Sequence, residues 1–289
     1  MKRILLFPIS LLYGLITALR NLCYDWGILK SYNFREHVIS VGNLAVGGTG
    51  KSPHIEYLNQ LLKDQFSVAN LSRGYSRKTR GYMEVFAENT AEEVGDEPKQ
   101  FKTKFPDISV AVDADRLRGI KQLLKKKPKP EIILLDDAFQ HRRVKPGLNI
   151  LLTDFRNLFV NDSMLPGGFL REYPSNYRRA DIIIITKTPE RITHLDLKVY
   201  SKEINLLPHQ KLRFEYGSQY AAPSLSHLSS AEKKQSRARR QSHHAAWHAH
   251  NQLPRAQASD FQKPTRNLHH GLKAIEQALQ PFLFWRAHQ

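Results

Sequence analysis

One stretch near the start of the chain, Val38 to Pro53, limits the possible folds more than any other. It reads VISVGNLAVGGTGKSP: a β-branched run, a glycine-rich segment, Lys51-Ser52, and then the start of a helical pattern. Strand, glycine loop, Lys-Ser and helix in this order are typical of a phosphate-binding loop. The glycines let successive N–H groups turn toward one anion, and the helix points its positive end at the same place. The stretch therefore predicts a nucleotide-phosphate site in an α/β fold; the alternative is a glycine-rich turn that binds nothing.

The predicted loop is a run of eight residues, each a candidate for nucleotide binding. They are Ala45, Val46, Gly47, Gly48, Thr49, Gly50, Lys51 and Ser52. In such a loop the lysine ammonium reaches the β- and γ-phosphates, and the hydroxyl after it binds Mg²⁺. The usual pattern begins with glycine where this chain has Ala45, while the GTGKS end of the pattern is intact.

Apolar runs recur along the next 170 or so residues at the spacing of a parallel sheet. Each is short, rich in β-branched residues or leucine, and separated from the next by a helical or polar segment. The runs lie at 67–71, 108–112, 131–135, 148–153 and 181–186. Strands that alternate with helices predict a doubly wound, mainly parallel α/β sheet, and we assign it to a core at 31–218.

Two carboxylates close the most apolar of these strands. Asp136 and Asp137 follow the run Ile132 to Leu135 directly. Beside a phosphate-binding loop, an aspartate at the end of a central strand is the expected Mg²⁺ ligand, direct or through water. The alternative is a pair of carboxylates that cap a turn, and the presence of both motifs in one chain favours the metal role.

A further acidic residue, Asp96, lies in the sequence VGDEP at the start of a helical pattern. An aspartate there is suited either to capping the helix or to acting as a catalytic base, and residue chemistry alone leaves both open.

Earlier in the chain, Arg73, Arg77, Lys78 and Arg80 form a basic cluster after a strand. It is either a solvated loop or part of a ligand crevice at the carboxyl end of the sheet.

The N-terminal segment is apolar and has basic residues at both ends. No charge occurs from Ile4 to Leu19, a run of 16 residues that is short of the roughly 20 needed to cross a bilayer. A signal peptide and a buried core helix are two possible interpretations. We favour a third, a helix within 1–30 that associates with a membrane without spanning it.

The net charge of the chain indicates what kind of partner it binds. The 289-residue chain has a formal net charge of +17, which favours an anionic partner. Nucleic acid is not expected, because no nucleic-acid-binding motif accompanies the charge. The single cysteine, Cys23, excludes an internal disulfide and fits a reducing compartment.

Taken together, the motifs resemble those of the tetraacyldisaccharide 4'-kinase family, the lipid A kinases of Gram-negative bacteria. The resemblance covers about residues 1–216 and rests on GNLAVGGTGKSP, LSRGYSRK, VGDEP, LLDDAFQHRR, LPGGFLRE and IIIITK, in that order. It implies a P-loop kinase on the cytoplasmic face of the bacterial inner membrane, peripheral or monotopic, held there by its N-terminal helix. It also implies ATP and Mg²⁺ as cofactors, and as substrate a lipid A precursor, tetraacyldisaccharide 1-phosphate, phosphorylated at its 4' hydroxyl.

The resemblance assigns roles to individual residues. Ala45 to Ser52 form the nucleotide site with Lys51 as a catalytic group, Asp96 is the catalytic base, and Ser52, Asp136 and Asp137 serve Mg²⁺. The family has glycine after the paired aspartates, where this chain has Ala138.

Residues 219–289 do not match the family pattern. They are rich in arginine and histidine, and no Asp-His pair follows Tyr216, although the family pairs such a histidine with its catalytic base. The segment reads as a frame-shifted or disordered replacement of the expected second lobe, with HHxxxHxH from His243 to His250 as a weak metal-binding alternative. We therefore expect a chain that binds nucleotide but transfers phosphate poorly. A third hypothesis is a basic interaction protein that uses ATP as a structural ligand.

Overall fold

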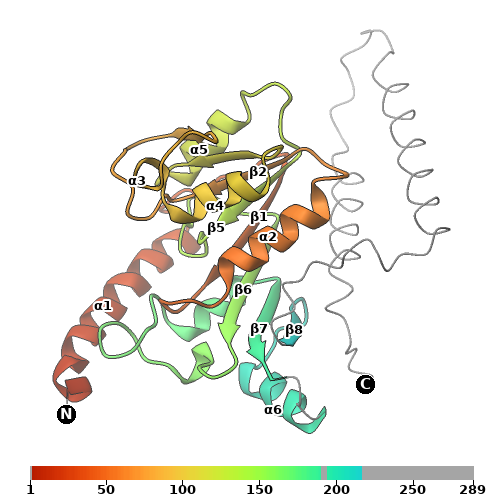
Figure 1. The fold of residues 1–289 in the computed structure, drawn as a ribbon. Helices are drawn as coiled ribbons and strands as arrows, with labels where there is room; N and C mark the ends of the chain where they lie inside the picture. Colours follow the sequence, from red (N-terminus) through yellow and green to blue (C-terminus); the bar gives the residue numbers. More distant parts are fainter. Residues whose placement is uncertain (1, 190–193, 217–289) are drawn as a thin grey trace, which may run out of the picture.

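The computed structural model describes residues 2–189 and 194–216, and within them the chain forms a single eight-stranded sheet (Figure 1). The strand order is β3-β4-β2-β5-β1-β6-β7-β8, and all neighbours are parallel except β3 and β4. The strands are β1 (His37–Asn43), β2 (Val68–Ser72), β3 (Met83–Val85), β4 (Ser109–Val112), β5 (Ile132–Asp136), β6 (Leu148–Asp154), β7 (Ile182–Thr188) and β8 (Lys211–Tyr216). This confirms the predicted doubly wound, mainly parallel sheet.

Helices cover both faces of this sheet. They are α1 (Lys2–Asp25), α2 (Lys51–Leu62), α3 (Ala91–Val94), α4 (Asp96–Lys104), α5 (Arg116–Leu123) and α6 (His194–Ile204), with 3₁₀ turns η1 (Phe159–Asn161) and η2 (Pro174–Arg179). On one face, α2 and α4 bury Ile55 and Phe101 against β-strand residues such as Leu134. On the other face, α5 buries Leu117 against Ile133, and η1, η2 and α6 cover β6 to β8.

The central strands are apolar on both sides because both of their faces are covered. In β5 the alternate residues Ile132 and Leu134 pack on the α2 side, while Ile133 and Leu135 pack on the α5 side. The register between β5 and β1 pairs Asp136 with Val41, so the end of β5 lies beside the strand that enters the predicted phosphate loop.

Local sequence patterns missed two parts of this fold. The short antiparallel edge strand β3 is only three residues long, too short to show a period. The connection from Asp137 to Gly147 crosses over β1 without a helix, in contrast to the regular alternation that we expected. The predicted tail at 219–289 and its HHxxxHxH motif lie outside the described residues, and the boundaries of the three predicted segments stay predictions.

The N-terminal helix α1 packs on the body with its polar face. Ser10 and Asn21 are buried, and a Cβ on Gly14 would lie 2.6 Å from the Tyr173 hydroxyl. Ser10 Oγ accepts from the Gly167 N–H at 2.9 Å, and Arg142 donates to the Asn21 carbonyl at 2.7 Å. The buried core helix that we considered is therefore excluded for α1, because its apolar face is turned outward.

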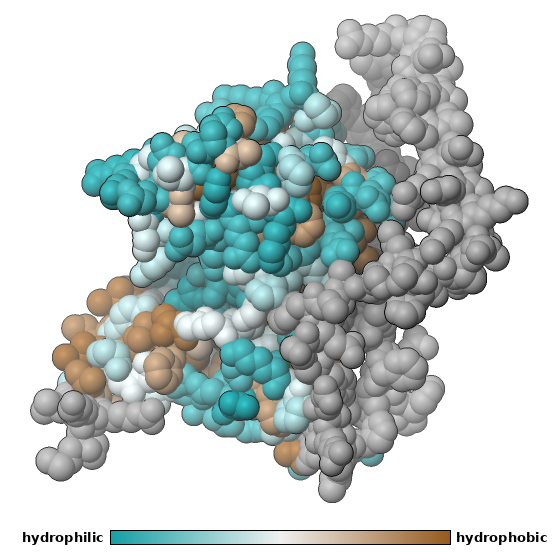
Figure 2. Space-filling model, in the orientation of Figure 1, coloured by the Kyte–Doolittle hydropathy of each residue, from teal (hydrophilic) through white to brown (hydrophobic). Residues whose placement is uncertain are grey.

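Figure 2 shows that apolar surface gathered over α1. The exposed apolar side chains of the helix are Phe7, Ile9, Leu11, Leu12, Leu15, Ile16, Leu19 and Leu22. The stretch Leu6–Asp25 is long and apolar enough to cross a membrane by length and composition alone. The length of the uncharged run therefore does not by itself exclude a span, because the apolar helix extends beyond that run.

Candidate functional site

The predicted phosphate loop, residues 45–52, links the end of β1 to the start of α2 as expected. Gly47 and Gly50 have φ of 113° and 85°, in the region that favours glycine. Asn43 at the end of β1 donates its side-chain N–H to Thr49 Oγ1 at 2.8 Å, and both residues are buried. The bend therefore follows from glycine at two positions and from a side-chain contact that spans the loop.

A second loop pairs with the first. The Arg171 N–H donates to the Leu44 carbonyl, and the Val46 N–H donates to the Phe169 carbonyl, each at 2.8 Å. These bonds join the motif LPGGFLRE to the start of the phosphate loop in an antiparallel ladder. The motif LPGGFLRE, to which the sequence alone assigned no role, is thus part of the site.

Arg171 also carries its side chain into the site. Its Nη1 and Nη2 donate to Asp137 Oδ2 and Oδ1 at 3.0 and 2.8 Å, a two-pronged ion pair. Lys51 Nζ lies 3.9 Å from Asp137 Oδ1. Burial alone would raise the pKa of Asp137, but the hydrogen bonds and charge of Arg171, with the charge of Lys51, hold it below its usual value. Asp137 is therefore an ionised carboxylate between two cations.

Asp136 has the opposite environment. It is fully buried, accepts from Ser72 Oγ at 3.2 Å through Oδ2, and its Oδ1 has no hydrogen-bond partner among the described residues. Burial, together with the negative charges of Glu97 and Asp137, raises its pKa to about 7. A buried carboxylate with an unpaired oxygen is a site that a cation would stabilise.

Arg116, the first residue of α5, holds the backbone beneath both aspartates. Its buried guanidinium donates to the carbonyl of Asp136 at 2.9 Å and to that of Asp137 at 3.4 Å. Burial lowers its pKa to about 10, against the opposing effect of the aspartate charges, so the guanidinium stays charged at neutral pH. Asp137 itself has φ of 46°, and this buried contact helps to keep that unusual backbone conformation.

The start of α4 lies beside the start of α2. Ser52 Oγ donates to Glu97 Oε1 at 2.8 Å, and one and two turns further along, Glu56 accepts from Gln100 and Lys104 at 2.7 and 2.8 Å. Because these contacts run in the same direction on both helices, the two N-termini point toward the same end of the sheet. Glu97 was not among the predicted site residues, although it follows Asp96 directly in VGDEP.

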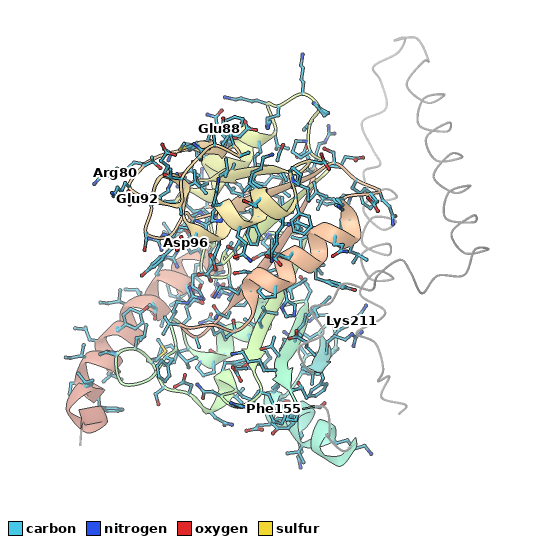
Figure 3. All side chains as sticks on the ribbon, in the orientation of Figure 1. Arg80, Glu88, Glu92, Asp96, Phe155 and Lys211 are labelled. Carbon is cyan, nitrogen blue, oxygen red and sulfur yellow. The ribbon has the colours of Figure 1, made fainter. Side chains whose placement is uncertain are left out.

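Asp96 is the first residue of α4, and its side chain is exposed. Figure 3 labels it at the start of α4, on the side of the molecule where α2 begins. It is therefore next in sequence to the residue that contacts Ser52, near the phosphate loop and open to an incoming molecule. The structure describes no side-chain hydrogen bond for it, so neither the capping role nor the base role is selected by a contact.

Two glycines, Gly74 and Gly95, allow the LSRGYSRK and VGDEP loops to approach each other closely. A Cβ on Gly95, where φ is 95°, would lie 3.1 Å from the Tyr75 carbonyl, and a Cβ on Gly74 would lie 3.0 Å from the Val94 carbonyl. The LSRGYSRK and VGDEP loops therefore meet backbone to backbone. Within the basic cluster, Lys78 pairs with Glu92 and Arg77 donates to the Gly81 carbonyl, so these two side chains serve the loop itself. Arg73 and Arg80 are exposed.

The donors present fit Mg²⁺ bound together with a nucleotide. In the part of the chain that the structure describes, no three His, Cys, Asp or Glu side chains form a ready metal cage. Mg²⁺ in phosphoryl-transfer sites takes one or two protein oxygens and completes its shell with phosphate and water. The Ser52 hydroxyl and the unpaired Asp136 oxygen meet this need. The structure brings Lys51, Ser52, Asp136 and Asp137 together at the carboxyl edge of the sheet, while Asp96 lies at the start of α4, next in sequence to Glu97.

Comparisons with known proteins agree with this geometry. The family model for "Tetraacyldisaccharide-1-P 4'-kinase" matches residues 2–256, which extends past the 216 residues that the motifs covered. A tetraacyldisaccharide 4'-kinase of Bacteroides thetaiotaomicron is 52% identical over 74% of this chain and 57% of its own length. A tetraacyldisaccharide 4'-kinase of Flavobacterium psychrophilum is 57% identical over 66% of this chain and 55% of its own.

A solved structure is similar over the same region. LpxK from Aquifex aeolicus in complex with ATP has a TM-score of 0.63 and 38% identity, over 74% of this chain and 64% of that one. The chain thus spans somewhat more than half the length of the curated relatives that it matches. On the motifs, the fold and these similarities together, the chain belongs to the tetraacyldisaccharide-1-P 4'-kinase family.

Proposed function

We propose that this chain is an ATP-dependent kinase that transfers the γ-phosphoryl group to the 4' hydroxyl of tetraacyldisaccharide 1-phosphate, a lipid A precursor. The observation that carries the proposal is the convergence of Lys51, Ser52, Asp136 and Asp137 at one edge of the sheet. Phosphoryl transfer depends mainly on positioning and charge neutralisation, and this cluster supplies both.

The roles divide by charge and exposure. Lys51 neutralises the β- and γ-phosphates, and Ser52 and Asp136 would hold Mg²⁺, which would neutralise further phosphate charge. Asp137 stays ionised between Lys51 and Arg171, and so orients both cations. Asp96 accepts the proton of the acceptor hydroxyl, supported by its exposure and by its place next to Glu97.

The acceptor is a lipid, and α1 accounts for how the chain would meet it. The polar face of α1 packs against the rest of the protein, and its exposed apolar face can enter the outer part of a bilayer. A helix docked along its side presents only one face, which supports a peripheral or monotopic arrangement. ATP is a cytosolic nucleotide, so we place the contact on the cytoplasmic face of the inner membrane.

A transfer assay tests the proposal. The full chain is incubated with γ-labelled ATP, Mg²⁺ and tetraacyldisaccharide 1-phosphate in mixed micelles, and labelled lipid is measured. Label at the 4' position that disappears in Asp136→Asn supports the proposal. Lys125→Ala, an exposed lysine in a distant loop, serves as a control that keeps the wild-type rate.

One alternative has a specific observation in its favour. The sequence holds no Asp-His pair after Tyr216, which favours a protein that binds nucleotide but transfers poorly. MgATP binding without labelled lipid would select this alternative, and absence of MgATP binding would contradict both functions.

A further inference from the structure

Lys187, near the end of β7, has a backbone conformation that lysine rarely adopts. Its φ is 57°, and the pairing of β7 with β8 shifts register between Ile185 and Thr188. A left-handed conformation at a residue other than glycine is unfavourable and persists where surrounding contacts hold it. Lys187 has such contacts at its side chain.

The ammonium of Lys187 joins two oxygens that are far apart in sequence. Its Nζ donates to Asp154 Oδ2 at the end of β6 and to the Gly48 carbonyl of the phosphate loop, each at 2.6 Å. Asp154 is itself fixed, because its Oδ1 accepts from the Arg156 N–H at 2.9 Å. The phosphate loop is thereby tied to two strands on the side of β1 opposite Asp136.

The contact falls on a peptide unit whose direction matters for anion binding. In a trans peptide the carbonyl and the following N–H point in opposite directions. A lysine that holds the Gly48 carbonyl therefore also fixes the direction of the Thr49 N–H, which in this structure donates to the Gly47 carbonyl at 3.1 Å. Asn43 holds the Thr49 side chain from the other flank, so both sides of this peptide unit are constrained.

Stability of the fold does not explain this contact. The Lys187 side chain is 52% exposed, and exposed ion pairs contribute little to folding free energy. The chain offers a matched comparison in Lys129, which is 53% exposed and forms one ion pair with Glu36, far from the phosphate loop. The feature that distinguishes Lys187 is its second partner, the loop carbonyl.

We propose that Lys187 is a positioning residue for nucleotide binding, which holds the Gly48 carbonyl and so fixes the backbone shape of the phosphate loop. This proposal rests on the nucleotide site of the proposed function. It adds a residue from the motif IIIITK that the proposed mechanism does not use.

The test measures equilibrium binding of MgATP and MgADP to the full chain. Lys187→Met keeps the aliphatic stem and removes the ammonium, so its Kd for both nucleotides should rise roughly tenfold, as expected for a lost charged hydrogen bond. Lys187→Arg should restore most of the affinity, because it can still donate to both oxygens. Lys129→Met should bind as the wild type does, and thermal unfolding temperatures should be alike in all four proteins.

Each other outcome counts against the proposal. Wild-type affinity in Lys187→Met, or an equal loss in Lys129→Met, overturns it. If Lys187→Met does not fold, Asp154→Ala decides, since it removes one of the two oxygens that hold the ammonium and must also weaken MgATP binding. A wild-type chain that binds no MgATP removes the proposed function and this inference with it, and so is distinguished from failure of the Lys187 proposal alone.

Discussion

Asp136 and Asp137 are adjacent in sequence, and yet their carboxylates have opposite proton affinities. Burial, with the negative charges of Glu97 and Asp137, raises the pKa of Asp136 to about 7 against the opposing charges of Arg116 and Lys51. The two-pronged ion pair with Arg171 instead holds the pKa of Asp137 below its ordinary value. The sequence predicted both as partners of Mg²⁺ but not this difference. It arises from contacts such as Arg171–Asp137 and Ser52–Glu97, which join residues 34 and 45 positions apart. Local motifs reveal the members of a site, while the sheet topology decides their neighbours.

At the residue scale, Lys51→Ala is expected to weaken MgATP binding by on the order of tenfold or more, because the phosphates lose a direct charge. Titration of MgATP into the full chain measures the effect. The free energy of unfolding should change little, since Asp137 keeps its ion pair with Arg171. Unchanged affinity in a folded variant would contradict the assignment of the loop, and Lys125→Ala is the control for loss of one positive charge.

His141 gives a prediction about pH. Burial, with the charge of Arg116, lowers its pKa from 6.5 to about 4. Between these values the unfolded chain binds a proton that the folded chain does not, so stability contributed by neutral His141 is present above pH 6.5 and lost as pH falls toward 4. Relative to His141→Gln, the wild type should lose up to about 2 kcal/mol of unfolding free energy between pH 7.5 and 5.

Urea unfolding of both proteins at several pH values measures that difference. A wild-type curve that runs parallel to the His141→Gln curve over this range would show that the histidine titrates normally. The comparison between the two proteins removes the contributions of the other titrating groups, which they share.

At the scale of elements, α1 shows what a hydropathy pattern predicts and what it omits. The apolar run predicted a helix, and the structure has one of 24 residues. The pattern did not reveal that Ser10, Gly14 and Asn21 line the inner side, because their partners lie more than 100 residues away. Tyr13 also donates to the Arg171 carbonyl at 3.2 Å, so α1 touches the loop that pairs with the phosphate loop.

Leu12→Glu with Leu19→Glu should therefore release the protein from anionic vesicles, because both side chains lie on the exposed apolar face. Co-sedimentation measures the bound fraction, and MgATP affinity should be unchanged. Removing residues 1–22 would be a poorer test, since it also removes the contact between Tyr13 and Arg171. Undiminished sedimentation of the double variant would mean that another surface binds the membrane.

Gly95→Ala tests the close approach of two loops. The added Cβ would lie 3.1 Å from the Tyr75 carbonyl at a φ of 95°, which together should cost about 1–3 kcal/mol. We expect a lower unfolding temperature and weaker MgATP binding, because Glu97 follows two residues later and contacts Ser52. Gly27→Ala is the control: that glycine also has positive φ, but its Cβ would meet nothing within 4 Å. Equal effects in both variants would show that backbone strain, and not the contact with Tyr75, is responsible.

At the scale of the whole molecule, the parallel sheet and the position of the site at its carboxyl edge followed from motifs that each come at the end of a strand, because parallel strands place their ends together. The order of the strands within the sheet was not predicted. The phosphate loop, both aspartates and the main strands were predictable for this reason. The helix-free crossover after Asp137 was not, since nothing in its composition distinguishes it from other polar connections.

The prediction for the whole chain concerns turnover. No Asp-His pair occurs in the sequence after Tyr216. We therefore predict that Asp96, the proposed base, works without the histidine that the family resemblance implies. General-base assistance is typically worth ~10²–10⁴-fold, and the chain should transfer phosphate slower by about that factor than a relative that carries the pair. Single-turnover rates at saturating MgATP compare the two proteins directly. Equal rates would show that another residue assists Asp96.

The outward apolar face of α1 has a consequence for kinetics. With α1 lying in a bilayer surface, the enzyme and the lipid acceptor diffuse in the same membrane plane. The carboxyl edge of the β-sheet then stays at a fixed height above that plane. The velocity should then follow the mole fraction of acceptor among the lipids, not its bulk concentration. Adding inert lipid at constant total acceptor should slow the reaction by surface dilution. Release of α1 from the surface by Leu12→Glu with Leu19→Glu should abolish that dependence.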